Sequence, residues 1–179
     1  HLAGAGDMVS LLINIELGLN DLKLAELIKE NPLAKVESVF HIRHEDGTVK
    51  FFDHALDPKL FGRVIILADD EKIPIHSDHS LDRIRQVRRE AKNDVFVRNA
   101  IRALKRIIPT GNIRDIDFVV MVGGSAKDFE IPTLISNRLS EYSVVAGSGN
   151  IRGVMGPRNA VATGLVLSYL ETEGSVVNG

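Results

Sequence analysis

The sequence contains no cysteine and no tryptophan, and it has only two tyrosines among its 179 residues. The absence of cysteine excludes disulfides, thiolate nucleophiles and metal sites that need a thiolate, and it permits a reducing compartment. No uninterrupted apolar run approaches the roughly 20 residues that a membrane span requires. We therefore expect a cytoplasmic protein that has no disulfide and does not interact with membranes.

Neither sign of charge is in large excess, because 22 basic and 24 acidic residues give a formal net charge of −2. This balance argues against a protein that is basic over its whole surface, although it permits a local basic patch. With 44% hydrophobic residues, the composition is that of an ordinary globular protein. The chain starts at His1 with neither an initiator methionine nor a signal sequence, so we interpret its start as a cut inside a longer protein.

The N-terminal residues predict two helices. Asp7 is a candidate N-cap for a helix with apolar residues at helical spacing, and Gly18 is placed to end it. Asn20 or Asp21 then opens a second helix, which ends before Pro32 because the residue preceding a proline resists the helical region.

The next part of the chain predicts strands. Residues 36–43, 49–52 and 64–67 suit strands, and residues 45–48 have the composition of a hairpin turn between the first two. We therefore assign residues 32–78 to a small β-rich subdomain.

The second half alternates helices and strands. Residues 81–107 predict one long helix capped by Ser80, and residues 118–122 form an apolar run typical of a strand buried on both faces. Helices near residues 132–139 and from Pro157 flank a short strand at residues 144–145. This order predicts an α/β fold, and we assign residues 1–31 and 79–179 to one lobe.

Gly123 and Gly124 end the apolar strand, and Ser125 follows them. Ligands of open α/β sheets bind at the carboxyl ends of the strands, and glycine lets a ligand lie against the main chain. The pattern therefore favours a nucleotide pocket wall, with a plain tight turn as the alternative, since neither GxxxxGK[ST] nor GxGxxG occurs. A second glycine cluster at residues 146–157 precedes the last helix, whose N-terminus could hold an anion.

Longer motifs resemble the large subunits of the diol and glycerol dehydratase reactivating factors. These are chaperones of cobalamin-dependent enzymes, built on the actin-like (ribonuclease H-like) ATPase fold that heat-shock chaperones share. The resemblance covers nearly the whole chain as a C-terminal part of such a subunit, and it implies an incomplete actin-like lobe with an inserted β-rich subdomain. It rests on HLAGAGDMV at 1–9, PLAKVES at 32–38, HEDG at 44–47, PTGNIRDI at 109–116, FVVMVGGS at 118–125, GNIRG at 149–153 and GPRNAVATGL at 156–165.

The resemblance implies where a nucleotide would bind. In that superfamily the strand ending in Gly-Gly is the adenosine motif, so Gly123 and Gly124 would pass under the ribose and the α-phosphate. Ser125 and Lys127 would then face the adenine.

Two further segments take part in the implied site. Gly4, Gly6 and Asp7 resemble the turn that closes the opposite side of the nucleoside. Residues 157–164 resemble the second connecting segment, but Arg158 stands where heat-shock chaperones carry an acidic residue.

The resemblance also implies a function. ATP or ADP with magnesium would bind the intact large subunit and switch its affinity for a small partner subunit and for an inactivated cobalamin-dependent diol or glycerol dehydratase, so that damaged cobalamin leaves. The phosphate-binding hairpins and the magnesium-coordinating carboxylates belong to the N-terminal part of that family. We therefore assign no catalytic and no metal-ligating residue here, and we expect the chain alone to hydrolyse no ATP.

The same lobe could instead serve a heat-shock-like or sugar-kinase-like ATPase. A third hypothesis is a nucleic-acid module, because residues 82–106 are strongly basic. Only Phe96 offers a stacking surface there, and no nucleic-acid-binding motif occurs, which favours a solvated helix face or arginines that meet acidic segments of the same protein. Basic residues near Arg89 and Lys92 could also approach the nucleotide.

Histidine chemistry is disfavoured. A zinc site would draw on His41, His44, His76 and His79, but strand residues three apart point to opposite faces and no cysteine supports the cluster. A Ser–His–Asp arrangement at residues 77–79 fails because adjacent residues cannot form a relay with one another. A surface loop is the better interpretation.

Overall fold

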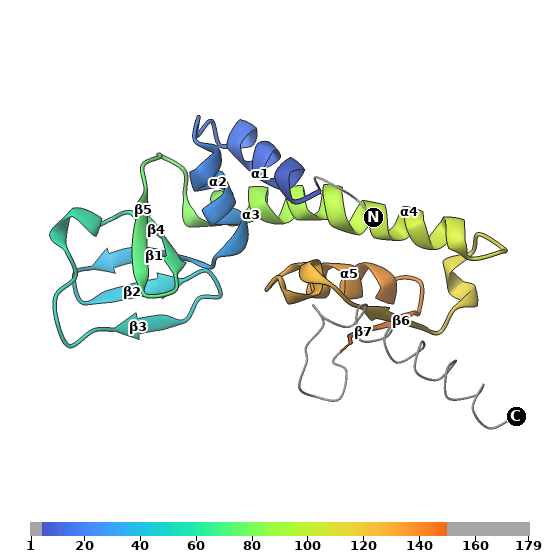
Figure 1. The fold of residues 1–179 in the computed structure, drawn as a ribbon. Coiled ribbons are helices and arrows are strands. Elements are labelled where there is room, and N and C mark those ends of the chain that lie inside the picture. The colour runs from blue at the N-terminus through green and yellow to red at the C-terminus, as the bar shows by residue number, and fades with distance from the viewer. Residues whose placement is uncertain (1–4, 150–179) are drawn as a thin grey trace, which may run out of the picture. The chain divides into compact units, whose positions relative to one another are not determined.

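The computed structural model describes residues 5–149. Gly4 and the helix expected from Pro157 lie outside the described residues. The chain forms two compact units, His1–Val95 and Phe96–Gly179, and each contains both helices and strands (Figure 1). The fold is therefore mixed α/β. The assignment of residues 1–31 and 79–179 to one lobe stays a prediction.

The first unit contains helices α1 (Ala5–Glu16), α2 (Leu22–Glu30) and α3 (Leu81–Lys92). The expected N-cap at Asp7 is wrong, because α1 already begins at Ala5 and Asp7 lies in its first turn. Gly18 follows α1 with φ +58° and ends the helix as expected. Asp21 caps α2 by accepting hydrogen bonds from the N–H groups of Lys23 and Leu24, both at 3.0 Å.

The strands of the first unit form one antiparallel sheet in the order β3-β2-β1-β4-β5. Its strands are β1 (Leu33–Ser38), β2 (His41–His44), β3 (Val49–Phe51), β4 (Val64–Ala68) and β5 (Glu71–Ile75). All five lie within the range 32–78 that the sequence assigns to a β-rich subdomain. The single strand expected over residues 36–43 is wrong, because the chain reverses between β1 and β2.

Both faces of this sheet are covered. Ala34, Val36, Ile42 and Ile65 are buried on one face, under apolar side chains of residues 52–60. On the other face, α3 contacts β1 and α2 contacts β4. The sheet therefore has an apolar cluster on one face and contacts with helices as well.

The long helix expected over residues 81–107 is interrupted. A π-helical segment, Asn93–Val97, separates α3 from α4 (Arg98–Ile107). Ser80 caps α3 as expected, with its Oγ 3.2 Å from the N–H of Arg83. A π turn holds one more residue than an α turn, so it shifts the side-chain register between the two helices.

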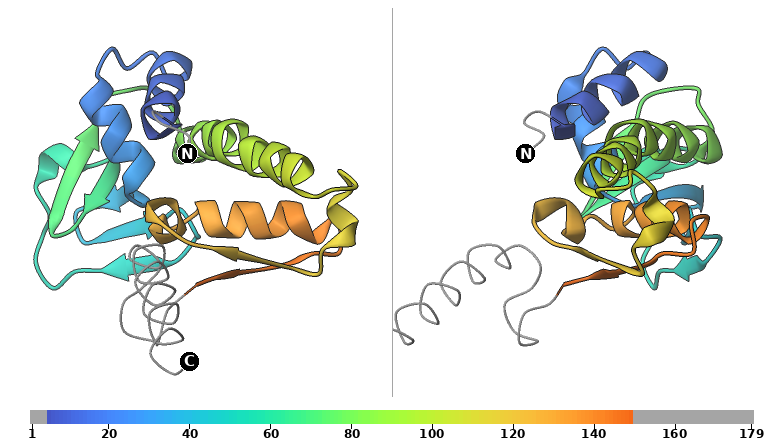
Figure 2. Two further views of the ribbon diagram at one scale, coloured as in Figure 1. Left: turned by 45° about the vertical axis from the view of Figure 1, so that its right-hand side comes forward. Right: turned by 90° about the vertical axis from the view of Figure 1, so that its right-hand side faces the viewer.

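The second unit packs α5 (Ile131–Ser140) on a parallel pair of strands, β6 (Phe118–Met121) and β7 (Val145–Ser148). In Figure 2, α5 lies along this pair, with α4 on its other side. Leu139 of α5, together with Ile113 and Val144, is buried at the centre of this unit. Side chains from both neighbours pack against them: Ile101 and Leu104 of α4, and Val119 and Ala146 of the strands.

The strand at residues 118–122 is not buried on both faces among the described residues. Phe118 is 57% exposed, Val120 51% and Val122 42%, and β7 adds Val145 at 64%. The alternate residues face α5, so the described part of the chain covers one face of this strand pair. No helix within residues 5–149 combines the length and the apolar character needed to cross a membrane.

Candidate functional site

The turn after β6 has a backbone that requires glycine at one position. Gly123 has φ +93° and ψ −171°, a conformation that side chains rarely adopt. The chain then enters a short 3-10 helix, Gly124–Lys127, in which the N–H of Ala126 donates to the carbonyl of Gly123 at 3.2 Å. The carboxyl end of β6 is therefore followed, after Val122, by two residues, Gly123 and Gly124, whose main chain carries no side chain.

Gly124 faces open space. Within residues 5–149, a Cβ placed on it would have no atom within 4 Å, and its φ lies outside the left-handed region. Gly124, Ser125 and Lys127 are all exposed. Four of the predicted site residues, Gly123, Gly124, Ser125 and Lys127, thus form one accessible turn at the carboxyl edge of the strand pair.

The structure adds Gly149 to this edge. Because β7 runs parallel to β6, with Met121 opposite Ser148, both strands end on the same side. The N–H of Gly149 donates to the carbonyl of Met121 at 2.8 Å, and a Cβ on Gly149 would lie 2.9 Å from Val120 Cγ1 and 3.0 Å from Val122 Cγ1. The second glycine cluster therefore begins beside the first.

A carboxylate fixes the far side of the turn. Asp128 Oδ1 accepts hydrogen bonds from the N–H groups of Glu130 at 2.8 Å and Ile131 at 2.9 Å, where α5 begins. These two hydrogen bonds satisfy backbone N–H groups at the start of α5. They also fix the backbone at the end of the short 3-10 helix. Ser125 and Lys127 are therefore presented from a defined backbone.

The other predicted segment lies in the first unit, at the start of α1. Asp7 is exposed there. A Cβ on Gly6 would lie 3.5 Å from Lys29 Nζ, and Ser10 Oγ lies 3.3 Å from the carbonyl oxygen of Gly6. Side chains of Ser10 and Lys29 thus lie against the backbone that carries two predicted site residues.

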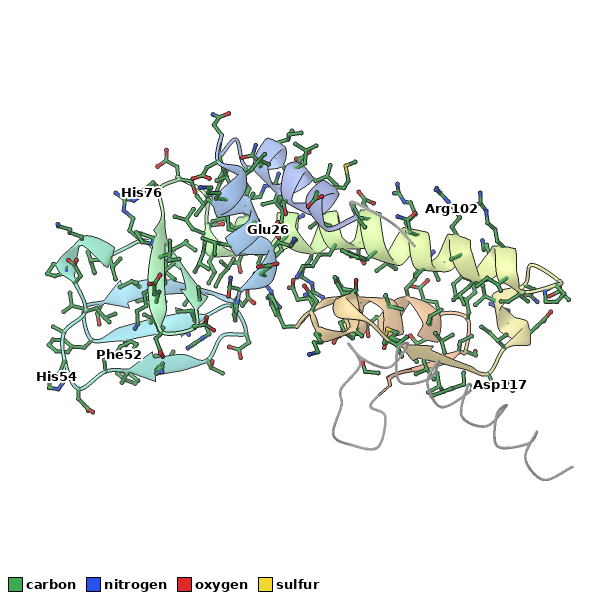
Figure 3. The ribbon with its side chains drawn as sticks, in the orientation of Figure 1. Glu26, Phe52, His54, His76, Arg102 and Asp117 are labelled. Atoms are coloured by element: carbon green, nitrogen blue, oxygen red, sulfur yellow. The ribbon has the colours of Figure 1, made fainter. Side chains whose placement is uncertain are left out.

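Glu26 joins these two side chains, and its position on α2 is labelled in Figure 3. One carboxylate oxygen accepts a hydrogen bond from Ser10, and the other accepts one from Lys29. Burial tends to raise the pKa of Glu26, but the bonds from Lys29 and Ser10 outweigh it and hold the pKa below its usual value. The cluster of Ser10, Glu26 and Lys29 links the first turn of α1 to α2. No local sequence motif predicts this cluster.

The histidines have other roles. His41 Nδ1 lies 2.6 Å from Ser38 Oγ, and His79 Nε2 lies 3.1 Å from the carbonyl of Leu17. His79 is thus joined to the end of α1 and not to Ser77. Within residues 5–149, no group of three or more histidine, aspartate or glutamate side chains is placed to hold a metal ion.

The basic segment divides into buried and exposed parts. Arg88 and Lys92 of α3 are fully buried, and Arg88 pairs with Glu45 at 2.7 Å. This matches arginines that meet acidic segments of the same protein, and it removes Lys92 from any solvated face. On α4, Arg102 and Lys105 are exposed, and Figure 3 shows Arg102 on the side of α4 away from α5.

Comparison with protein families gives a match along almost the whole chain. Residues 1–169 match the family described as the diol dehydratase reactivase ATPase-like domain. The chain is 60% identical over 169 residues to the propanediol dehydratase-reactivating factor large subunit of Salmonella typhimurium and to the diol dehydratase-reactivating factor large subunit of Klebsiella michiganensis. It spans 28% of the length of these relatives.

Two solved structures resemble this fold closely. A glycerol dehydratase reactivase matches with a TM-score of 0.86 and 60% identity, over 93% of this chain and 27% of the other. A diol dehydratase-reactivating factor in nucleotide-free form matches with a TM-score of 0.86 and 58% identity, over the same shares.

Proposed function

Because the chain belongs to the diol dehydratase reactivase ATPase-like family, we propose that it forms the adenosine-side wall of an actin-like ATPase domain in a reactivating factor. The observation that carries this proposal is the accessible Gly123–Gly124 turn at the carboxyl edge of two parallel strands. Ligands of open α/β sheets bind at such edges.

The turn suits a nucleoside in three respects. The open space at Gly124 lets a ribose or an α-phosphate lie against the main chain. Ser125 supplies a hydroxyl that can donate or accept a hydrogen bond, and Lys127 supplies an aliphatic stem with a charged end. Gly149 keeps the neighbouring strand end free of a side chain.

In the whole protein, we propose that ATP or ADP binds with magnesium, and that the magnesium ligands and the phosphate-binding hairpins come from other parts of the polypeptide. Gly4, Gly6 and Asp7 would close the opposite side of the nucleoside. Nucleotide binding would then switch the affinity for a small reactivase subunit and for an inactivated cobalamin-dependent diol or glycerol dehydratase in the cytoplasm, releasing damaged cobalamin.

Calorimetric titration of the full-length large subunit with ADP tests the nucleotide site. Gly124→Val should abolish measurable ADP binding, because its side chain would occupy the space proposed for the ribose and α-phosphate. The fold should survive this change, since Gly124 is exposed and an added Cβ would meet no atom of the described residues within 4 Å. Circular dichroism and the thermal midpoint check the fold.

Ala103→Val is the matched control, because Ala103 is exposed on α4 and the change ends in the same side chain. It should bind ADP as the unchanged protein does. If Gly124→Val kept the unchanged affinity for ADP, the Gly-Gly turn would be a structural turn only and the proposal would fail.

A further inference from the structure

The first unit contains a pocket of about 480 Å³ that the proposed nucleotide site does not use. It lies where β4 begins and where the chain passes from β5 to α3. Its lining has two basic side chains, two serines and a histidine against one acidic side chain. The residues are Lys35, Phe61, Gly62, Arg63, Val64, Ser77, Asp78, His79 and Ser80.

The two basic residues of this pocket differ from the paired arginines of the same unit. Arg43 is bound to Glu37, with Nε 2.7 Å from Oε1, and Arg88 is bound to Glu45. Among the residues that the structure describes, neither Lys35 nor Arg63 has a carboxylate within ion-pair distance. Lys35 is half-buried on β1.

The pocket lining also includes a polar group that lacks a hydrogen-bond partner. Ser77 Oγ is buried and has no hydrogen-bond partner within the described chain. A buried hydroxyl without a partner is destabilising, because it has lost its hydrogen bonds to water. Because Ser77 is one of the lining residues, rotation of its side chain would bring this hydroxyl to an acceptor in the pocket.

The local field favours an anion. α3 begins at the pocket, directly after its N-cap Ser80, and a helix N-terminus carries about half a positive charge. His79 uses Nε2 at the carbonyl of Leu17, which leaves Nδ1 as its other polar atom. Asp82 in the first turn of α3 offsets part of the charge of the helix end. Among the lining side chains, Asp78 supplies one negative charge against Lys35 and Arg63, so the lining is net positive.

From the unpaired cations, the unpartnered hydroxyl and the helix end, we infer that this pocket binds a small oxyanion of the phosphate class. A phosphate carries nearly two negative charges at neutral pH and several strong acceptor oxygens. Lys35 and Arg63 supply the counter-charges, and Ser77 donates to an oxygen. The pocket shares no residue with the proposed nucleotide edge, and phosphate binding there requires no ATP hydrolysis.

The test is a titration of the full-length protein with inorganic phosphate. Binding is measured by calorimetry and by the shift in thermal midpoint, and chloride at matched ionic strength is the blank. Excess ADP is present throughout, so that phosphate binding at a nucleotide site is suppressed. We expect saturable binding in the millimolar range. The double variant Lys35→Gln/Arg63→Gln should weaken it about tenfold or more, because two charge-assisted contacts are lost.

Lys59→Gln is the matched control, since Lys59 is exposed in the same subdomain but does not line the pocket. It should leave phosphate affinity within about twofold, because screening weakens distant surface charges. Absence of saturable binding, or equal weakening in the control and in the double variant, would overturn the inference.

Ser77→Ala gives an independent measurement. Without phosphate this variant should be as stable as the unchanged protein or more so, because an unsatisfied buried hydroxyl is removed. With phosphate it should show a smaller rise in thermal midpoint than the unchanged protein. An equal rise in both would exclude Ser77 as a donor and contradict the proposed site.

Discussion

Gly123 and Gly124 stand side by side after β6 but meet different physical demands. The backbone conformation at Gly123 requires glycine. Any other residue would be strained by about 1–3 kcal/mol at φ +93° and ψ −171°. Gly124 has an ordinary φ and open space, so the fold itself tolerates a side chain there. Substitution at Gly124 therefore separates ligand binding from folding, and substitution at Gly123 does not.

Glu26 is one residue through which pH should act on the stability of the first unit. Its pKa is held below the usual value by bonds from Lys29 and Ser10. A lowered pKa in the folded state adds stability that is present above the ordinary glutamate pKa and is lost as the pH falls through the folded-state pKa. At neutral pH, Glu26→Gln should lower the free energy of unfolding by about 0.5–1 kcal/mol, since the pair is partly exposed.

The measurement is urea unfolding from neutral pH down into the acid range. The gap between the unchanged protein and Glu26→Gln should narrow as the pH falls. Glu16→Gln serves as control, because Glu16 makes only a 3.8 Å ion pair with Arg83. A gap for Glu26→Gln that stays constant with pH would show that the carboxylate charge contributes nothing.

At the scale of elements, Arg88 joins three parts of the first unit. It is fully buried on α3, and Nη1 donates to the carbonyl of Asn31 at 3.1 Å, at the end of α2. Nη2 donates to Glu45 in the turn between β2 and β3 at 2.7 Å. One guanidinium thus connects both helices to the sheet.

Arg88→Met should therefore destabilise the protein by about 3–5 kcal/mol, because Glu45 and a helix-end carbonyl lose a buried partner. Chemical denaturation at neutral pH measures this loss. Arg89→Met, on the next residue of the same helix and partly exposed, should change stability by about 0.5 kcal/mol or less. Equal losses in both variants would mean that Arg88 acts only through helix propensity.

Elements with strong local signals were predictable from the sequence. Asp21 and Ser80 cap α2 and α3, and Gly18 ends α1, because capping depends on a few adjacent residues. The turn at residues 45–48 is equally local, since Gly47 adopts φ +91° and Asp46 Oδ1 accepts from the N–H of Thr48 at 2.9 Å.

The errors concern signals that are weak or non-local. The turn between β1 and β2 contains neither glycine nor proline, and it is held by Ser38 Oγ, which accepts from the N–H groups of Phe40 and His41, both at 3.1 Å. The π segment is visible in the sequence, because the spacing between apolar residues is longer from Val95 to Ala100. β5 was not predicted from the sequence, because Pro74 lies within it. The proline is tolerated because β5 is an edge strand of the sheet.

The candidate site was predictable only in part for the same reason. A strand that ends in Gly-Gly is visible in the sequence, so Gly123 and Gly124 could be named. The position of Gly149 beside them depends on parallel pairing of β6 with β7, residues far apart in the chain. The contact of Lys29 with Gly6 likewise depends on how α2 packs on α1.

At the scale of the whole molecule, the chain spans 28% of the length of its curated relatives. Within residues 5–149, Phe118, Val120 and Val145 are exposed on one face of β6 and β7. A reactivating factor needs two states, and nucleotide must bind one better than the other, because a ligand with equal affinity for both shifts nothing. The turn at Gly124 is where we place this differential binding.

The last prediction follows from that requirement. The full-length large subunit, with its small partner, should restore activity to a glycerol-inactivated diol or glycerol dehydratase when ATP, magnesium and fresh adenosylcobalamin are supplied. Gly124→Val should remove this reactivation, whereas Ala103→Val should retain it. The assay is dehydratase turnover before and after addition of the complex. Equal reactivation without nucleotide, or phosphorylation of a small sugar by the complex, would instead favour a function outside ATP-dependent reactivation.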